Sequence, residues 1–240
     1  MNDYSYFAKY YDLLYSNKNY KQESQKLAKI LEKTLKTAGK EILEVACGTG
    51  EHIKYLKNRF KFTGIDLDKN MLKIARNKNP QVHFKVADMK SFSMNKKFDA
   101  ITCLFSSIGY VENRQELRKT IENFSNHLKE GGALVIEPLF TKDTFPKNFR
   151  HLRCYDGDSV KLSRLLKANF KGNYVFLDSY YTLSEGKSKQ VKQWHDRHRL
   201  FLFTQKELLK ILEEAGFKAK YRKKGLSGRG LFVAINIQNL

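Results

Sequence analysis

The chain has 240 residues, of which 41% are hydrophobic, 29% are charged and three are proline, a composition typical of a compact globular protein rather than a disordered one. Its formal charge of +20 favours anionic ligands, although lysine-rich surface usage gives the same excess, so the charge excludes neither small phosphorylated molecules nor nucleic acid. No apolar run could span a bilayer, and Asn2, Asp3 and Lys9 interrupt any signal-peptide pattern, so we expect a cytoplasmic protein without a membrane partner.

Predicted helices and strands alternate through the first 140 residues. Residues 22–36 place Leu27, Ile30 and Leu31 at helical spacing, and Gly39 follows that helix. Strands are predicted over 41–47, 61–66, 82–87, 98–105 and 133–137, and helices over 51–58, from the cap Asn70 to before Pro80, and over 113–128 up to a Gly131-Gly132 turn. Strands that each lead into a helix predict a parallel, doubly wound sheet with its ligand loops at the carboxyl ends of the strands.

Residues 148–203 break this alternation. Strand-like runs over 160–170, 174–183 and 198–203 are separated by turns at Lys171-Gly-Asn and Glu185-Gly-Lys, which predicts an antiparallel insertion over the ligand edge of the sheet. Thr204 then caps a helix to Ala215, and strands over 217–223 and 230–237 complete the sheet. Because the insertion has too few apolar residues to fold alone, we expect one domain over 1–240, with residues 1–38 as a helical lid.

A glycine turn follows the first strand, in Glu41-Ile-Leu-Glu-Val-Ala-Cys-Gly-Thr-Gly50, and Asp66 ends the next strand. The glycines let the backbone approach a ligand, and Asp66 can accept hydrogen bonds from ribose hydroxyls. Glu44 would repel a pyrophosphate but suits the ammonium and sulfonium of a methionyl group. The third glycine of dinucleotide sites is also missing, because Ile53 occupies that position. The pattern therefore indicates a nucleoside site and disfavours NAD(P).

The Glu-Val-Ala-Cys-Gly-Thr-Gly motif resembles that of class I S-adenosylmethionine (SAM)-dependent methyltransferases. Further motifs are Tyr11-Asp12, Tyr20, Val86-Ala-Asp-Met89, Cys103-Leu-Phe-Ser-Ser-Ile-Gly-Tyr110, Gly131-Gly-Ala-Leu-Val-Ile-Glu-Pro138 and Gly228-Arg-Gly-Leu-Phe232. Together, and nearly end to end, they resemble the N,N-dimethyltransferases of nucleotide-linked amino-deoxysugars. The resemblance implies a Rossmann-like, doubly wound, mostly parallel seven-stranded sheet with an antiparallel β insertion capping the active site. It also implies SAM as cofactor, S-adenosylhomocysteine as its product, and no metal.

The resemblance also implies which residues bind SAM. They are Tyr11, Tyr20, Ala46, Gly48, Asp66, Asp88, Met89 and Leu104, to which the residue pattern adds Glu44 and Met71. We expect Asp66 to hold the ribose, Met71 to pack on the adenine and Asp88 to accept from the adenine amino group. The alternatives are a helix cap for Asp88, plain core packing for Met71, and surface aromatic rings for Tyr11 and Tyr20.

Acceptor residues are expected around Tyr4, which matches a family position near the acceptor, and Tyr110. A phenol has an ordinary pKa of about 10 and is a poor base at neutral pH, so Tyr110 is predicted to orient an amine by a hydrogen bond. Glu137 is predicted to hold an ammonium or take its proton; alternatively, it fixes the following loop. Arg229 is predicted to pair with a phosphate or with the SAM carboxylate.

The acceptor itself is the least defined part. A hydroxyl acceptor would need a dedicated base, and no histidine with a convincing carboxylate partner is evident, which favours an amine. The six histidines are expected at the surface or behind the site, and Trp194-His195 is the first pair to test: the others are His52, His83, His127, His151 and His198. The sequence leaves open O-methylation of a small molecule, an RNA or protein acceptor docked on the basic insertion, and a monomer or a homodimer.

Overall fold

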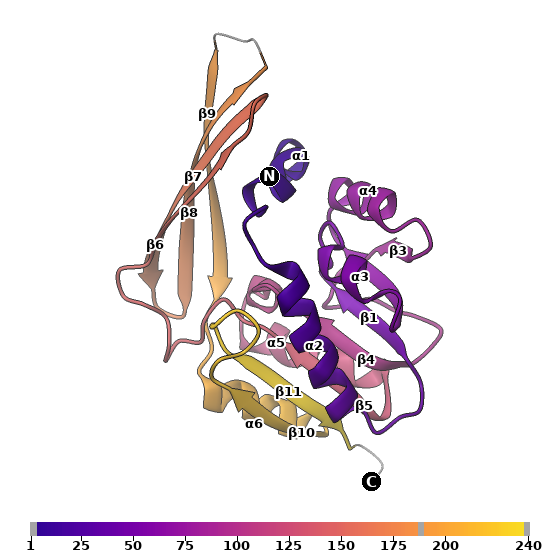
Figure 1. Cartoon of the computed structure of the whole chain (residues 1–240). Helices are drawn as coiled ribbons and strands as arrows, with labels where there is room; N and C mark the ends of the chain where they lie inside the picture. The colour runs from indigo at the N-terminus through magenta and orange to yellow at the C-terminus, as the bar shows by residue number, and fades with distance from the viewer. Residues whose placement is uncertain (1–3, 187–189, 238–240) are drawn as a thin grey trace.

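The computed structural model describes residues 4–186 and 190–237, which form two sheets (Figure 1). The larger sheet contains β1 (Glu41–Val45), β2 (Lys61–Asp66), β3 (His83–Val86), β4 (Phe98–Cys103), β5 (Leu128–Ile136), β10 (Phe217–Arg222) and β11 (Leu231–Asn236). Its strand order is β10-β11-β5-β4-β1-β2-β3, parallel from β5 to β3, with β11 antiparallel to both neighbours. The predicted mostly parallel seven-stranded sheet is therefore confirmed.

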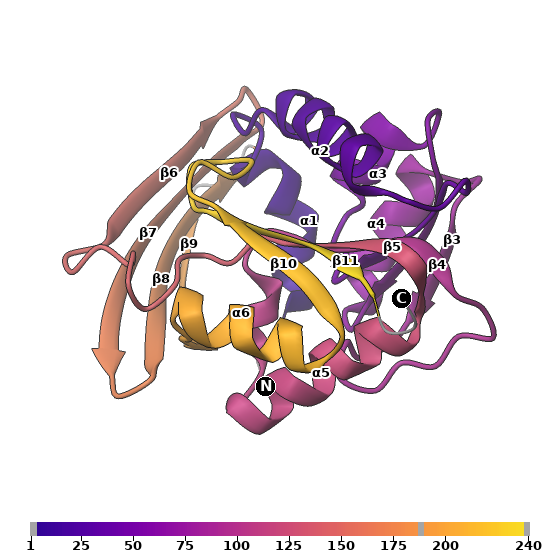
Figure 2. The ribbon, with the colours of Figure 1, turned by 90° about the horizontal axis from the view of Figure 1, so that it is seen from below.

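Helices cover both faces of this sheet (Figure 2). They are α2 (Tyr20–Thr34), α3 (Glu51–Leu56) and α4 (Lys69–Lys78) on one face, and α5 (Arg114–Asn126) and α6 (Gln205–Glu214) on the other. Leu27 and Ile53 are buried on the first face, and Phe124 and Leu212 on the second. Within a helix the buried residues recur at helical spacing, as Leu27 and Leu31 do in α2, so one stripe of the helix packs on the sheet.

Two local predictions are wrong. Asp68, not Asn70, caps α4, because its side chain accepts hydrogen bonds from the backbone N–H groups of Asn70 and Met71. The Gly131-Gly132 pair does not precede β5 but lies inside it. Pairing with β4 shifts register across these glycines, so the pair forms an irregularity within the strand, where Gly131 adopts φ +71°. Thr204 caps α6 as predicted, in a capping box with Glu207.

The insertion forms the smaller sheet. It is an antiparallel meander of β6 (Arg150–Asp156), β7 (Val160–Lys171), β8 (Tyr174–Glu185) and β9 (Val191–Phe201). The prediction missed β6 and the first half of β9, since few apolar residues mark them. The Lys171-Gly-Asn turn is confirmed, with Gly172 at φ +62°. Lys187, at the end of the second predicted turn, lies outside the described residues.

Helix α1 (Tyr4–Leu14) lies between the two sheets and contacts α4, β6 and β7 (Figure 1). Its buried residues Phe7, Tyr10 and Leu14 pack with Leu162 and Tyr181 of the smaller sheet. The N-terminal segment thus joins the insertion to the main domain. In the described part of the chain, no helix combines the length and the apolarity that a bilayer crossing requires.

Candidate active site

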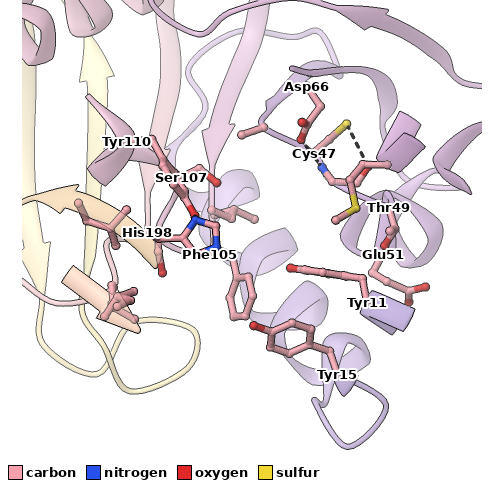
Figure 3. A pocket seen from close by; sticks show the side chains of 18 of the residues that line it. Tyr11, Tyr15, Cys47, Thr49, Glu51, Asp66, Phe105, Ser107, Tyr110 and His198 are labelled. Atoms are coloured by element: carbon pink, nitrogen blue, oxygen red, sulfur yellow. Dashed lines mark hydrogen bonds between the residues drawn. The ribbon is translucent and has the colours of Figure 1, made fainter. Parts of the chain in front are cut away.

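A cavity of about 620 Å³ lies between the carboxyl ends of the parallel strands and the inner face of the smaller sheet (Figure 3). The predicted residues that line it are Tyr11, Tyr20, Glu44, Ala46, Gly48, Asp66, Met71, Asp88, Met89, Leu104, Tyr110 and Arg229. Glu137 does not line it and is fully buried behind the cavity wall. Tyr4 begins α1, and its side chain is outside the described part of the structure.

The glycine turn after β1 has left-handed backbone at Ala46, Gly48 and Gly50, with φ between +52° and +71°. A Cβ added at Gly48 would have no heavy atom within 4 Å, whereas one at Gly50 would lie 2.9 Å from Nδ2 of Asn79. Gly50 is therefore required by packing, and Gly48 leaves space on the cavity side. Space of this kind lets a ligand reach the backbone.

Asp66 is held at the end of β2 by two backbone groups. The N–H of Gly48 donates to its Oδ2 at 2.8 Å, and that of Asp68 donates to its Oδ1 at 2.9 Å. Burial raises the pKa of Asp66 despite these hydrogen bonds. Because each carboxylate oxygen has a second lone pair, Asp66 can still accept from ligand hydroxyls.

Glu44 has one satisfied and one unsatisfied oxygen. Its side chain is almost fully buried, and Oε1 lies 3.5 Å from Nδ1 of His52. Oε2 is buried and accepts no hydrogen bond from any described residue. A buried carboxylate oxygen without a donor is costly, so this atom indicates a site for a hydrogen-bond donor of a ligand.

A buried charge network lies beside Glu44. Nε2 of His52 is 3.2 Å from Oε2 of Glu23, and Lys18 forms an ion pair with the same carboxylate. Burial disfavours the charged imidazole, but hydrogen bonds to Glu23 and Glu44 outweigh it and raise the pKa of His52 to about 9. Burial also disfavours the charged form of Glu23 and would raise its pKa. Hydrogen bonds from His52 and Lys18 outweigh burial and lower the pKa of Glu23 to about 2. The network therefore places fixed charges in the cavity wall beside Glu44. His52 is buried within it and is not a surface residue.

Aromatic rings close the cavity on the α1 side. Tyr11 and Tyr15 have ring centroids 4.7 Å apart, and Tyr15 packs edge-on against Phe105 at 5.1 Å (Figure 3). The hydroxyl of Thr49 donates to Oδ1 of Asp12 at 2.7 Å, which ties this helix to the glycine turn. The segment that carries Tyr11 and Asp12 therefore covers the glycine turn.

Tyr110 and His198 lie side by side at the cavity and point toward one another (Figure 3). The Tyr110 hydroxyl is 3.1 Å from Nδ1 of His198, and Nε2 of His198 is 2.7 Å from Oδ2 of Asp196. The expectation that no histidine has a carboxylate partner is therefore wrong. A second pair, His195 and Asp178, lies 3.1 Å apart outside the residues that line the cavity, because side chains alternate faces along β9.

Three guanidinium groups line the cavity beside the smaller sheet. Arg153 lies 4.7 Å from the Tyr15 ring centroid, and Arg164 donates to the Tyr15 hydroxyl at 2.9 Å. Arg229 lies 4.7 Å from the Phe105 ring centroid. Within the described residues, none of the three has a carboxylate within ion-pair distance, and Nε of the buried Arg164 has no hydrogen-bond partner. Burial, together with the charges of Arg164 and Arg229, lowers the pKa of Arg153. This wall favours an anionic ligand.

Comparison with known proteins identifies the family. A model described as a methyltransferase domain matches residues 42–132. The dTDP-3-amino-3,6-dideoxy-α-D-glucopyranose N,N-dimethyltransferase of Streptomyces fradiae is 31% identical over 237 residues, covering 97% of this chain and 92% of the relative. The chain belongs to the SAM-dependent methyltransferases.

Solved structures agree with this assignment. DesVI of Streptomyces venezuelae superposes with a TM-score of 0.89 at 31% identity, covering 96% of this chain and 98% of its own. SAM-bound CalS10, an amino pentose methyltransferase from Micromonospora echinaspora, gives a TM-score of 0.84 at 27% identity and covers 96% of each chain. The methyltransferase therefore uses SAM as its methyl donor.

The groups that line the cavity of this methyltransferase fit SAM. Glu44 presents a buried oxygen without a partner, Gly48 leaves open space, and Asp66 is oriented by two N–H groups. Met71 both lines the cavity and packs in the core, and Asp88 both lines the cavity and accepts from the N–H of Lys90 at 2.9 Å. Core packing is thus found for Met71, whereas Asp88 lies in a turn and caps no helix. Among the described residues, no cluster of His, Cys, Asp or Glu could hold a metal ion.

Proposed function

We propose that this methyltransferase N-methylates a nucleotide-linked amino-deoxysugar. The Streptomyces relatives are named for dTDP-linked amino sugars and match almost the whole chain. The observation that carries the proposal is the set of guanidinium groups of Arg153, Arg164 and Arg229, which line the cavity and have no carboxylate partner among the residues that the structure describes. A diphosphate between nucleoside and sugar would supply the missing negative charge. A cavity lined from two sheets also suits a small acceptor better than RNA or a protein chain.

Bound SAM supplies a methyl group on a positively charged sulfur, which an amine lone pair can accept directly. The chain's residues then have to bind, orient and exclude water. Glu44 would accept from the methionyl ammonium and Asp66 from the ribose, while the rings of Tyr11 and Tyr20 cover the site. Holding two reactants in near-attack geometry can lower a barrier by about 7–11 kcal/mol, so positioning is the main requirement.

We assign the acceptor end as follows. Arg153 and Arg229 would hold the phosphates, and Tyr110 would orient the amine. Glu137 would act through the loop that carries Arg229: its Oε1 accepts from the Ser227 hydroxyl at 2.7 Å, and Arg229 Nε donates to the same hydroxyl at 3.1 Å. Fixing this loop, which lies between β10 and β11 and is not the loop that follows Glu137, explains its buried position better than proton transfer does.

Steady-state kinetics with matched acceptors tests this function. The same amino sugar is offered free and nucleotide-linked to the wild type and to Arg153→Gln and Arg229→Gln. A charge-assisted hydrogen bond contributes about 1.5–3 kcal/mol, so each variant should raise KM for the nucleotide-linked sugar about tenfold or more. The KM for the free sugar should stay unchanged. Arg150→Gln, on the same strand as Arg153 but exposed and outside the cavity, is the control. Equal effects on both acceptors would refute the phosphate assignment.

A further inference from the structure

Tyr110 alone can position the acceptor amine, so positioning does not account for the pair formed by Asp196 and His198. Both side chains lie on the inner face of β9 and are mostly buried, with 22% and 12% exposure. His198 contacts Tyr110, the last residue of the 3₁₀ helix η1 (Ser107–Tyr110), and both residues line the cavity. We propose that Tyr110, His198 and Asp196 form a proton relay that removes a proton from the acceptor's ammonium group.

Amine methylation requires such a proton to leave. An alkylammonium has no lone pair, so the acceptor must lose a proton before it attacks. The nitrogen pair then forms the N–C bond, and the pair of the breaking C–S bond goes to sulfur, giving S-adenosylhomocysteine. The product nitrogen carries the positive charge and must lose another proton before any second transfer. The inference rests on an amine acceptor, which the proposed function specifies as an amino sugar.

The hydrogen bonds set the direction of the relay. Nε2–H of His198 donates to Asp196, which leaves the Nδ1 lone pair to accept from the Tyr110 hydroxyl. The ammonium proton passes to the phenol oxygen as the phenol proton passes to Nδ1. Tyr110 ends neutral and His198 ends as an imidazolium beside the Asp196 carboxylate. Imidazole changes charge near neutral pH, whereas a phenol does not, so the pair supplies the base that Tyr110 lacks.

Asp196 remains charged in this setting. Burial disfavours its carboxylate, but the hydrogen bond and charge of His198 outweigh burial and lower the pKa of Asp196. The elements around Asp196 and His198 carry further charged or titratable groups. These are Arg199 on β9, Glu112 after η1, Arg164 on β7, and His151 and Arg153 on β6. On the same face, β8 presents the neutral Leu177 and Ser179 and the titratable Tyr181, whose pKa burial raises to about 12. Asp196 is the carboxylate in contact with the His198 ring, so removing it should affect the ring more than removing any of these other charged groups.

Kinetics across pH tests the relay. His198→Asn should lower kcat at pH 7 about 100-fold, the lower end of general-base effects. The deficit should shrink as the pH rises to about 10, where solvent removes the ammonium proton. Asp196→Asn and Tyr110→Phe should show smaller deficits of the same shape. His195→Asn, which breaks the equivalent pair with Asp178 outside the cavity, should match the wild type. A kcat for His198→Asn within twofold of wild type at pH 7, or a deficit independent of pH, would overturn the relay.

A second measurement does not require an acceptor. In the S-adenosylhomocysteine complex, nitrogen-15 NMR assigns the tautomer of the neutral His198 ring, with His198→Asn identifying its resonances. The relay requires Nε2–H toward Asp196 and an unprotonated Nδ1 toward Tyr110, and Asp196→Asn should weaken that preference. A neutral ring protonated on Nδ1 would contradict the relay. If the wild type methylates simple amines but no nucleotide-linked sugar, the proposed substrate fails, while the pH profile measured on those amines still decides the relay.

Discussion

Replacing His52 by glutamine should remove a pH-dependent part of the stability. The buried imidazole lies 3.2 Å from Glu23 and 3.5 Å from Glu44, and these contacts raise the pKa of His52 from its ordinary 6.5 to about 9. One pKa unit corresponds to 1.36 kcal/mol, so the protonated ring contributes on the order of 3 kcal/mol to the free energy of unfolding. Because the folded pKa is the higher one, this contribution is complete below pH 6.5 and is lost as the pH rises to about 9.

Urea unfolding at pH 6 and pH 9.5 measures this difference. At pH 6, His52→Gln should be less stable than the wild type by about 3 kcal/mol, or about 6–12 °C in melting temperature for a chain of this size. At pH 9.5 most of that difference should vanish. His83→Gln, an exposed histidine on β3, should track the wild type at both values. A destabilisation by His52→Gln that is the same at both pH values would refute the reasoning.

Three further substitutions have defined outcomes. Glu44→Gln should weaken S-adenosylhomocysteine binding about tenfold or more in calorimetry, because the neutral amide loses the charge-assisted bond; unchanged affinity would remove Glu44 from the site. Gly50→Ala should cost about 1–3 kcal/mol in urea unfolding, since φ is +71° and the new Cβ lies 2.9 Å from Asn79; a neutral effect would contradict the packing. Ser227→Ala should cost about 1–3 kcal/mol and raise the acceptor KM, because buried Glu137 loses a donor; an unchanged KM would argue against the loop-fixing role.

The larger sheet was predictable because its signals are local. The glycine turn, its preceding strand and Asp66 lie close together in sequence, and buried parallel strands appear as continuous apolar runs. The exposed β6 and the first half of β9 lack such runs, since most of their side chains are exposed or half-buried. The cap of α4 depends on which neighbouring side chain reaches the N–H groups, and two candidates two positions apart look alike in sequence.

The cofactor end of the cavity was predictable for the same reason, because its residues lie in and beside motifs at strand ends. The acceptor end was not. Arg153 and Lys18 are two of many basic residues, and only packing brings them to the cavity. The pair of Asp196 and His198 did leave a signal, since residues two apart on a strand share a face. That signal is informative only once the strand is known to begin before residue 196.

Methyl transfer followed by mass spectrometry tests the central claim most directly. Purified protein is incubated with SAM and a dTDP-linked amino-deoxysugar, with the free sugar and RNA as parallel acceptors. The account predicts that the nucleotide-linked sugar gains one or two methyl groups on its nitrogen, with matching formation of S-adenosylhomocysteine. Methylation of RNA with no transfer to any amino sugar would contradict it.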